Sequence, residues 1–184
     1  MSVFQGQSHH TYFVYGANMH PEQIARRCGS PERVGVARVA GHRLAFFGHT
    51  SVWDGGEEAA EPCEGEEVWG VLYRLPFEQA DRLDDWQGVR ADGTGAYFLF
   101  PVLAEDVHGV NHAALLYRKD VCGAPALPSD GQRDFIVAAA QAQGMPDGYL
   151  AHLKSLEVTK ARYPVPKLEG REHWFSALRC RSCG

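Results

Sequence analysis

The chain has 184 residues, of which 45% are hydrophobic and 22% are charged, and this predicts one compact domain with a hydrophobic core. The formal net charge is −5 and the basic residues are scattered, which argues against a nucleic-acid-binding or anionic-membrane-binding surface. No segment has the run of about 18 apolar residues that spans a membrane, and no signal-peptide pattern opens the sequence. We therefore expect a cytoplasmic protein.

The five cysteines are dispersed and odd in number, which is typical of a reduced intracellular protein and not of a disulfide framework. Only Cys180 and Cys183 have the CxxC spacing of metal or redox sites. One such pair is half of a zinc site, which His9 and His10 could complete only if the two termini meet. There is no GxGxxG or GxxxxGK motif. We therefore expect neither a metal nor a cofactor, and a C-terminal tail without chemistry.

In the first half of the chain, TYFVYG (residues 11–16) has the aromatic and β-branched character of a buried strand that stops at a glycine. Pro21 suits the first position of a helix that follows. Two further strands are expected at residues 34–39 and 42–47. Residues 49–67 are rich in glycine and acidic side chains and lack periodicity, so they are expected to form a long loop with at most a short strand.

In the second half, residues 68–75 predict a strand, and Pro76 opens a helix with Phe77, Ala80 and Leu83 on its buried face. Two more strands follow, the first of which contains Pro101 and is therefore expected to lie at an edge or a bulge. They are AYFLFPVL (residues 96–103) and HAALLYR (residues 112–118).

The last third of the chain is expected to be helical. Ser129 can cap a helix that ends at Gly144, and a second helix follows Pro146 with Leu150, Leu153 and Leu156 as its buried stripe. Strands with peripheral helices predict an α+β fold. The expected division is a flexible N-terminus (residues 1–10), one domain (residues 11–158) and a C-terminal extension (residues 159–184).

Four segments together resemble the γ-glutamylcyclotransferase-like family, also called the AIG2-like group. YFVYGANM (residues 12–19) is similar to the family signature Y-F-x-Y-G-S-N-[LM], and GEEVWGVLYRL (residues 65–75) to its strand G-x-x-V-x-G-x-[VL]-[YW]. LDDWQGV (residues 83–89) lines up with the turn L-D-x-x-E-G-V. Residues 128–157 resemble the family's P-S-x-x-Y helix and the G-L-P segment after it. The four occur in the family's order over most of the chain.

The resemblance implies a small mixed β-barrel with flanking helices and a cavity at one end. In that cavity, backbone N–H groups of the loop after the first strand would hold an anionic or carbonyl oxygen, as a glycine-containing turn can. The residues expected to bind substrate are Tyr15, Gly16, Ala17, Asn18, Met19 and Tyr117. The alternative is a plain connection between strand and helix, with Asn18 as a helix cap.

In the reaction that the resemblance implies, the α-amine of a γ-glutamyl group attacks its own γ-carbonyl, closes a five-membered lactam and expels an amine. The family moves the protons with the glutamate of its L-D-x-x-E-G turn. That glutamate falls on Gln87, whose amide can orient a substrate but cannot carry a proton. Loss of a general base typically lowers the rate about 10²–10⁴-fold. Gln87 is therefore expected to act as a hydrogen-bond donor that polarises a carbonyl.

Other residues could supply the missing base. Asp85 lies two positions before Gln87 but is expected to face solvent, and Asp84 is expected to brace the turn. His20 carries an imidazole, a group that can take up and release a proton near neutral pH, but it is expected at the surface, where the helix begins. The family's loop serine is Ala17 here, and the tyrosine of its P-S-x-x-Y helix is Gln132.

The sequence therefore favours an enzyme with an altered active site, acting on a small molecule with a carboxylate or amide by lactam formation, amide cleavage or a related lyase or isomerase step. The alternative is a protein of the same fold that binds such a molecule without turning it over. A metal or redox protein is the third reading. Neither nucleic acid nor a membrane is an expected partner, and two copies of the chain could complete the site as a homodimer.

Overall fold

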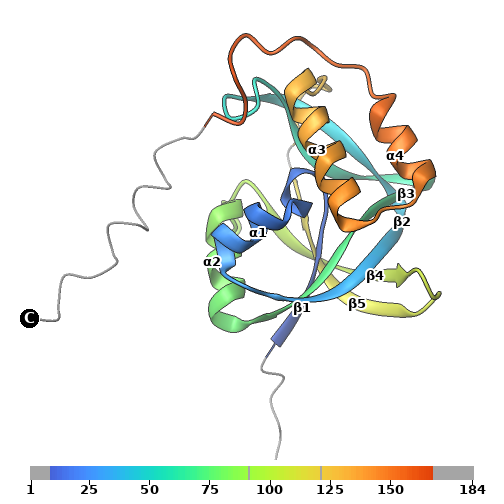
Figure 1. Ribbon diagram of the computed structural model, residues 1–184. Coiled ribbons are helices and arrows are strands. Elements are labelled where there is room, and N and C mark those ends of the chain that lie inside the picture. Colours follow the sequence, from blue (N-terminus) through green and yellow to red (C-terminus); the bar gives the residue numbers. More distant parts are fainter. Residues whose placement is uncertain (1–8, 91, 121, 168–184) are drawn as a thin grey trace, which may run out of the picture.

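The computed structural model describes residues 9–90, 92–120 and 122–167. Within these residues, five strands close into a barrel in the order β1-β3-β2-β4-β5 (Figure 1). The strands are β1 (His9–Val14), β2 (Glu32–Thr50), β3 (Gly55–Pro76), β4 (Phe98–Asp106) and β5 (Asn111–Arg118). The helices are the 3₁₀ helix η1 (Gly16–Met19) and the α-helices α1 (Pro21–Cys28), α2 (Phe77–Gln87), α3 (Asp130–Gln143) and α4 (Asp147–Lys154). The predicted α+β class and mixed barrel are confirmed.

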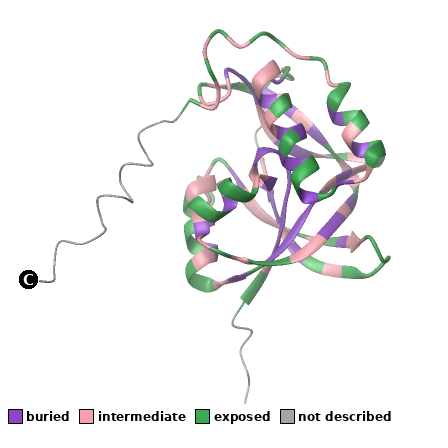
Figure 2. Cartoon of the chain, viewed as in Figure 1, coloured by how far each residue is buried: buried purple, intermediate pink, exposed green. Residues whose placement is uncertain are grey.

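The first strand makes the barrel mixed, because β1 runs antiparallel to β3 on one side and parallel to β5 on the other. At the centre of β1, Phe13 lies opposite Leu72 of β3 and Leu116 of β5, and all three side chains are fully buried. Buried residues gather on the strands inside the barrel and on the inner faces of the helices (Figure 2). The aromatic run that predicted a buried strand therefore forms part of the core.

The hairpin of β2 and β3 differs from the sequence-based prediction. The two strands expected at residues 34–39 and 42–47 are one strand, with Gly41 at φ +70° where the register shifts. The loop expected at residues 49–67 is wrong: β3 begins at Gly55, after a turn of four residues. Small residues are needed at its start, because a Cβ at Gly55 would lie 2.4 Å from the backbone nitrogen of Ser129. The glycines that suggested a loop are therefore part of a strand, where they allow the backbone near Ser129 to pack closely against it.

The remaining strands and the third helix follow the prediction. Pro101 pairs with Leu115 of β5, while β4 meets β2 only near Asp106, so the proline lies on a free edge. The hydroxyl of Ser129 accepts a hydrogen bond from the backbone N–H of Gln132, and α3 ends at Gly144 in the left-handed conformation.

Two expected helix faces differ in detail. On α2, Ala80 and Leu83 are buried, but Phe77 is 51% exposed and meets the ring of His10 edge-on. On α4, Leu153 and Tyr149 are buried and Leu150 is half-buried, while Leu156, expected on the same helix, lies beyond its end at Lys154 and is half-buried against the core. Both helices thus bury a narrower stripe than the periodicity predicted.

The third helix braces the loop that leaves β1. The side-chain amide of Gln143, on the last turn of α3, donates hydrogen bonds to the carbonyl of Met19 at 2.8 Å and to the phenol of Tyr73 at 3.0 Å. The ring of Phe135 on the same helix stacks on that of His20, with centroids 4.7 Å apart. The path of η1 is therefore fixed by buried contacts from a helix far away in the sequence.

Residues 159–167, here called the C-terminal strap, return across the tip of the β2–β3 hairpin. Thr159 exchanges backbone hydrogen bonds with Pro128 and Asp130, and the backbone nitrogen of Lys167 donates to the carbonyl of Val52 at 2.7 Å. Between them, the guanidinium of Arg162 pairs with the buried carboxylate of Asp54. The division at residues 10 and 158 stays a prediction.

Among the described helices, none is long and apolar enough to cross a membrane. The pair Cys180 and Cys183 lies outside the described residues, so its expected lack of chemistry stays a prediction.

Candidate functional site

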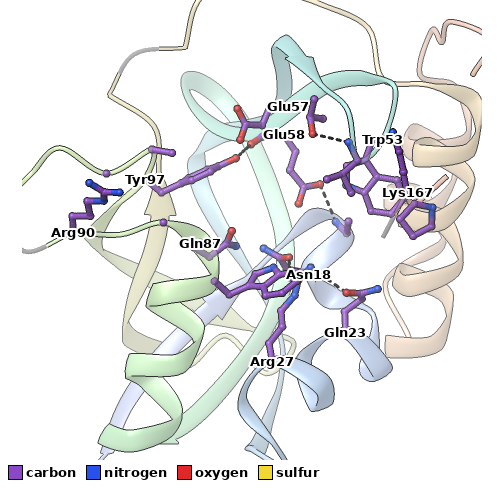
Figure 3. A pocket seen from close by; sticks show the side chains of 18 of the residues that line it. Asn18, Gln23, Arg27, Trp53, Glu57, Glu58, Gln87, Arg90, Tyr97 and Lys167 are labelled. Carbon is purple, nitrogen blue, oxygen red and sulfur yellow. Dashed lines mark hydrogen bonds between the residues drawn. The ribbon is translucent and has the colours of Figure 1, made fainter. Parts of the chain in front are cut away.

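A cavity of about 520 Å³ with both polar and apolar walls opens at one end of the barrel (Figure 3). Its walls come from η1, the start of β3, the end of α2 and the C-terminal strap. Lining residues from these walls include Ala17, Asn18, Trp53, Glu58, Gln87 and Lys167. Segments far apart in the sequence therefore meet around one hollow, whose volume suits a small molecule.

The loop after β1 turns into the cavity at Gly16, whose φ of +62° is one that glycine adopts without strain. The next backbone N–H, that of Ala17, donates a hydrogen bond to the Oε2 atom of Glu58 at 2.9 Å. A Cβ at Gly16 would lie 2.3 Å from that same oxygen, so the glycine leaves the room that the carboxylate occupies. The first donor of the expected anion-binding loop is thus paired with a carboxylate of the chain itself.

Glu58 is the ionisable group that sequence reasoning missed. Burial disfavours its charged form and raises the pKa of its carboxyl group to about 7, although the N–H of Ala17 and the charge of Arg27 oppose the shift. The neighbouring Glu57 forms an ion pair with Lys119. Glu58 lies in the segment that was expected to be a loop, and no motif in the sequence marks it.

Gln87 lies at the last residue of α2, on another wall of the cavity. The helix is capped by Gly88, which has the left-handed conformation. The backbone N–H of Gly88 donates a hydrogen bond to the carbonyl of Asp85 at 3.1 Å. Figure 3 shows the side-chain amide of Gln87 turned into the hollow. The glycine that ends the helix thereby presents an amide to the cavity, as the resemblance implied.

Arginine and tryptophan side chains join α1 to the end of α2. The guanidinium of Arg27 donates to the side-chain oxygens of Asn18 and Gln23, and it lies 4.7 Å from the centre of the Trp86 ring. A cation above an aromatic face is attracted by the electrons of the ring. This contact fixes the wall that carries Gln87 relative to the loop that carries Asn18.

The aspartate before Gln87 braces α2, as expected. Asp84 accepts hydrogen bonds from the phenol of Tyr117 at 2.6 Å and from that of Tyr12 at 3.2 Å. Burial raises the pKa of its carboxyl group, while the two phenols oppose the shift. Asp84 does not line the cavity. It holds the helix to β1 and β5.

The expected site residues therefore divide into two groups. Ala17, Asn18 and Gln87 line the cavity. Tyr15 lies behind it: its phenol donates to the carbonyl of Tyr117 at 2.8 Å and accepts from the N–H of Ala60 at 3.0 Å.

The remaining expected residues also lie outside the lining. Gly16 is in contact with Glu58 from behind, and Met19 is fully buried beneath η1. The phenol of Tyr117 points to Asp84 and not into the hollow. The roles of all these residues in binding stay predictions.

The other candidate bases have different roles. Asp85 is exposed and does not line the cavity. The Nδ1 atom of His20 accepts a hydrogen bond from the N–H of Glu22, so His20 caps α1, as its expected surface position suggests. Among the described residues, no three His, Cys, Asp or Glu side chains are grouped as metal ligands.

The fold and this cavity define a closed five-stranded barrel protein with a small-molecule-sized site at one end. The model of the AIG2-like family matches residues 67–153. The chain is 31% identical over 151 residues to the γ-glutamylcyclotransferase of Homo sapiens, covering 79% of this chain and 78% of that protein, and 30% identical to that of Mus musculus over the same length.

Solved structures agree with these relatives. A structure described as γ-glutamyl cyclotransferase superposes with a TM-score of 0.78 at 28% identity, covering 85% of this chain and 93% of the other. An uncharacterised human protein superposes with a TM-score of 0.79 at 26% identity, covering 86% and 94%. The chain belongs to the γ-glutamylcyclotransferase-like family.

Proposed function

We propose that this protein is an enzyme that closes a γ-glutamyl group, or a closely similar glutamate-derived group, into a five-membered lactam and releases an amine. The observation that carries the proposal is the meeting of the Ala17–Asn18 backbone, the amide of Gln87 and an ionisable carboxyl group in one cavity. The relatives that share about 30% identity with the chain are named γ-glutamylcyclotransferases. Their named activity agrees with these three features.

The chemistry requires little beyond positioning and proton transfer. The attacking amine and the carbonyl belong to one molecule, so the entropy of bringing them together is largely already lost. A cavity that holds the substrate's carboxylate and directs hydrogen-bond donors at its carbonyl oxygen stabilises the charge that develops there. The side chain of Gln87 supplies donors of this kind.

The proposed substrate is a small molecule with a carboxylate or amide. Both signs of charge occur at the cavity: Glu57 and Glu58 on one wall, and Arg27, Arg90 and Lys167 on the others. A molecule that carries an ammonium and a carboxylate group is complementary to such a lining.

A second candidate function is binding without turnover. The observation that favours it is the amide at position 87, on the turn where the family signature has a glutamate. In this case the protein would hold a carboxylate ligand as a sensor or as an accessory subunit.

A panel of γ-glutamyl amines and γ-glutamyl amino acids tests both candidates. Release of lactam and amine in equal amounts supports the enzyme. Thermal stabilisation by the same compounds without product supports the binding protein, because a ligand stabilises by mass action whether or not it reacts. Absence of both product and stabilisation with every compound overturns both proposals.

A further inference from the structure

Lactam closure needs a group that takes a proton from the substrate's ammonium and later returns one to the leaving nitrogen. The side chain at the end of α2 cannot do this, because an amide such as that of Gln87 has no accessible pKa. An ionisable group elsewhere in the cavity must therefore carry the proton.

We propose that Glu58, on β3, is that proton carrier, and that this chain holds its catalytic carboxylate on a different wall from the turn where the family signature has one. The inference rests on the function proposed above. It adds a catalytic residue that neither the motifs nor the resemblance identifies.

The geometry fits a catalytic carboxylate held at one end. The Oε2 atom of Glu58 is fixed by the N–H of Ala17, at 2.9 Å, in the space left by Gly16. The described residues give the Oε1 atom no hydrogen bond, and Figure 3 shows the carboxylate facing the hollow that the amide of Gln87 also enters. One oxygen is therefore positioned by the backbone while the other can meet a substrate.

The surroundings set the proton affinity that such a role needs. Burial raises the pKa of the Glu58 carboxyl group to about 7. A group whose pKa lies near the working pH can accept a proton in one step and donate it in the next. The titratable and charged groups that face it, from each element packed around it, are Tyr15, Arg27, Glu57, Tyr97 and Tyr149. Three of these are phenols whose own pKa values are raised by burial, so they stay neutral near pH 7.

The other carboxylates near the site lack this combination of position and environment. Glu57 lines the cavity but forms an ion pair with Lys119. Asp84 is enclosed by two phenols away from the cavity, and Asp85 is exposed to solvent. Only Glu58, among these four, lines the cavity with an oxygen free to meet a ligand.

The proton balance is complete with one carboxylate. Glu58 takes a proton from the α-ammonium, and the freed nitrogen attacks the γ-carbonyl carbon to form the ring C–N bond. The carbonyl oxygen becomes negatively charged and is stabilised by the donors of Gln87. As the old C–N bond breaks, protonated Glu58 returns its proton to the leaving nitrogen. Glu58, again a carboxylate, takes the second proton from the ring nitrogen and passes it to the released amine, which leaves as an ammonium ion. Two protons thus leave the α-nitrogen and two reach the leaving nitrogen, and Glu58 ends as a carboxylate.

Moving the carboxylate between the two walls tests this assignment. We would compare the wild type with Glu58→Gln, Glu58→Asp, Gln87→Glu and the double variant Glu58→Gln/Gln87→Glu, and measure lactam release from γ-glutamyl-alanine between pH 5 and 9. Glu61→Gln is the matched control, because Glu61 lies on the same strand, pairs with Arg43 and does not line the cavity.

We expect kcat/KM of the wild type to rise with pH to a plateau with a midpoint near 7. Glu58→Gln should lower kcat about 10²–10⁴-fold and remove this pH dependence. Glu58→Asp should retain the dependence at a reduced rate. The double variant should recover at least about tenfold over Glu58→Gln, because it restores an ionisable group to the same cavity.

Two failures can be told apart. If the wild type and Glu61→Gln are active and folded Glu58→Gln keeps more than about a third of their activity with the same pH profile, Glu58 is not the proton carrier, while the proposed function stands. If the wild type releases no lactam but Gln87→Glu does, the proposed function itself fails for this chain. Retained thermal stability of Glu58→Gln confirms that any loss of rate is not a loss of fold.

Discussion

The two walls of the cavity that carry Gln87 and Glu58 differ in what fixes them and in what they can do. Gln87 ends a helix that is held to the barrel by two phenols on Asp84, and it presents an amide without an accessible pKa. Glu58 lies on a strand, is held by a single backbone N–H, and presents a carboxyl group whose pKa is raised to about 7. The recognisable motif thus lies on one wall, and the group able to move a proton lies on the other.

Under the proposed assignment, the site keeps its shape while its proton transfer depends on a different element. Lactam closure requires an ionisable group beside the substrate. Both β3, through Glu58, and the end of α2, through position 87, present a side chain to the cavity where such a group can act.

The largest effect is expected from Gly16→Ala. The new Cβ would lie 2.3 Å from the Glu58 carboxylate. The alanine would also have to adopt the φ of +62° that Gly16 has, which is strained for a residue with a side chain. We expect a loss of lactam release of at least about 10²-fold. Gly41→Ala is the matched control, because Gly41 has φ +70° but nothing within 4 Å of its added Cβ. Equal activity of the two variants, in the same assay, would show that the contact with Glu58 does not matter.

Substitution of Asp84, which braces the wall that carries Gln87, should mainly change the free energy of unfolding. In Asp84→Asn, the phenols of Tyr12 and Tyr117 lose a charged acceptor in a half-buried place, which costs about 1–3 kcal/mol in the free energy of unfolding. Chemical denaturation measures this loss. Asp85→Asn, at the exposed neighbour, should change the free energy by less than about 0.5 kcal/mol. A similar small change in both variants would contradict the bracing role.

The sequence predicts the elements that are determined by neighbouring residues, and it fails for those that are determined by contacts with distant segments. The strand after Thr11 and the capped helix after Ser129 were predictable because their signals are local: aromatic and β-branched residues in one, and a hydroxyl followed by a glycine stop in the other. The start of β3 was not predictable, because Gly55 and Gly56 are there to let distant backbone come close.

The site shows the same limit. The resemblance located Ala17 and Gln87, which line the cavity, because they belong to motifs of the loop and the turn. Glu58 has no such signal: its neighbours are small and acidic, and its importance comes from pairing with the N–H of Ala17, 41 residues away. Only the closed barrel brings the two together.

The charge of Glu58 should be visible in the stability of the protein. Its folded-state pKa of about 7 lies above the ordinary 4.5, so the folded protein retains a proton that the unfolded chain releases between these values. Stability from this group is therefore full below about pH 4.5 and is lost as the pH rises through 7. We expect Glu58→Gln to melt about 3 °C higher than the wild type at pH 8 and at the same temperature at pH 4.5. A constant difference between these pH values would contradict a raised pKa.

The smallest effect is expected from Arg162→Ala in the strap, which removes one side-chain partner of buried Asp54 and leaves another, His49. Hydrogen bonds from Arg162 hold the pKa of Asp54 well below its ordinary 3.8, so their stabilisation is present above that value and is lost as the pH falls. We expect a melting temperature about 2 °C lower at pH 7, with the difference shrinking towards pH 3, and a raised KM because Pro166 and Lys167 line the cavity.

Arg43→Ala is the control for the strap, since Arg43 pairs with Glu61 and Glu66 on the exposed part of the same hairpin. Exposed ion pairs contribute little, so this variant should leave both the melting temperature and KM nearly unchanged. An Arg162→Ala protein with an unchanged KM would show that the strap does not shape the site.

The most direct measurement is the titration of the Glu58 carboxyl carbon by NMR on glutamate-labelled protein, assigned by its disappearance in Glu58→Gln. The account predicts a midpoint near pH 7 in the free protein, which moves when pyroglutamate fills the cavity. A midpoint near the ordinary glutamate value of 4.5, unaffected by ligand, would contradict the role of β3 as the wall that carries the proton.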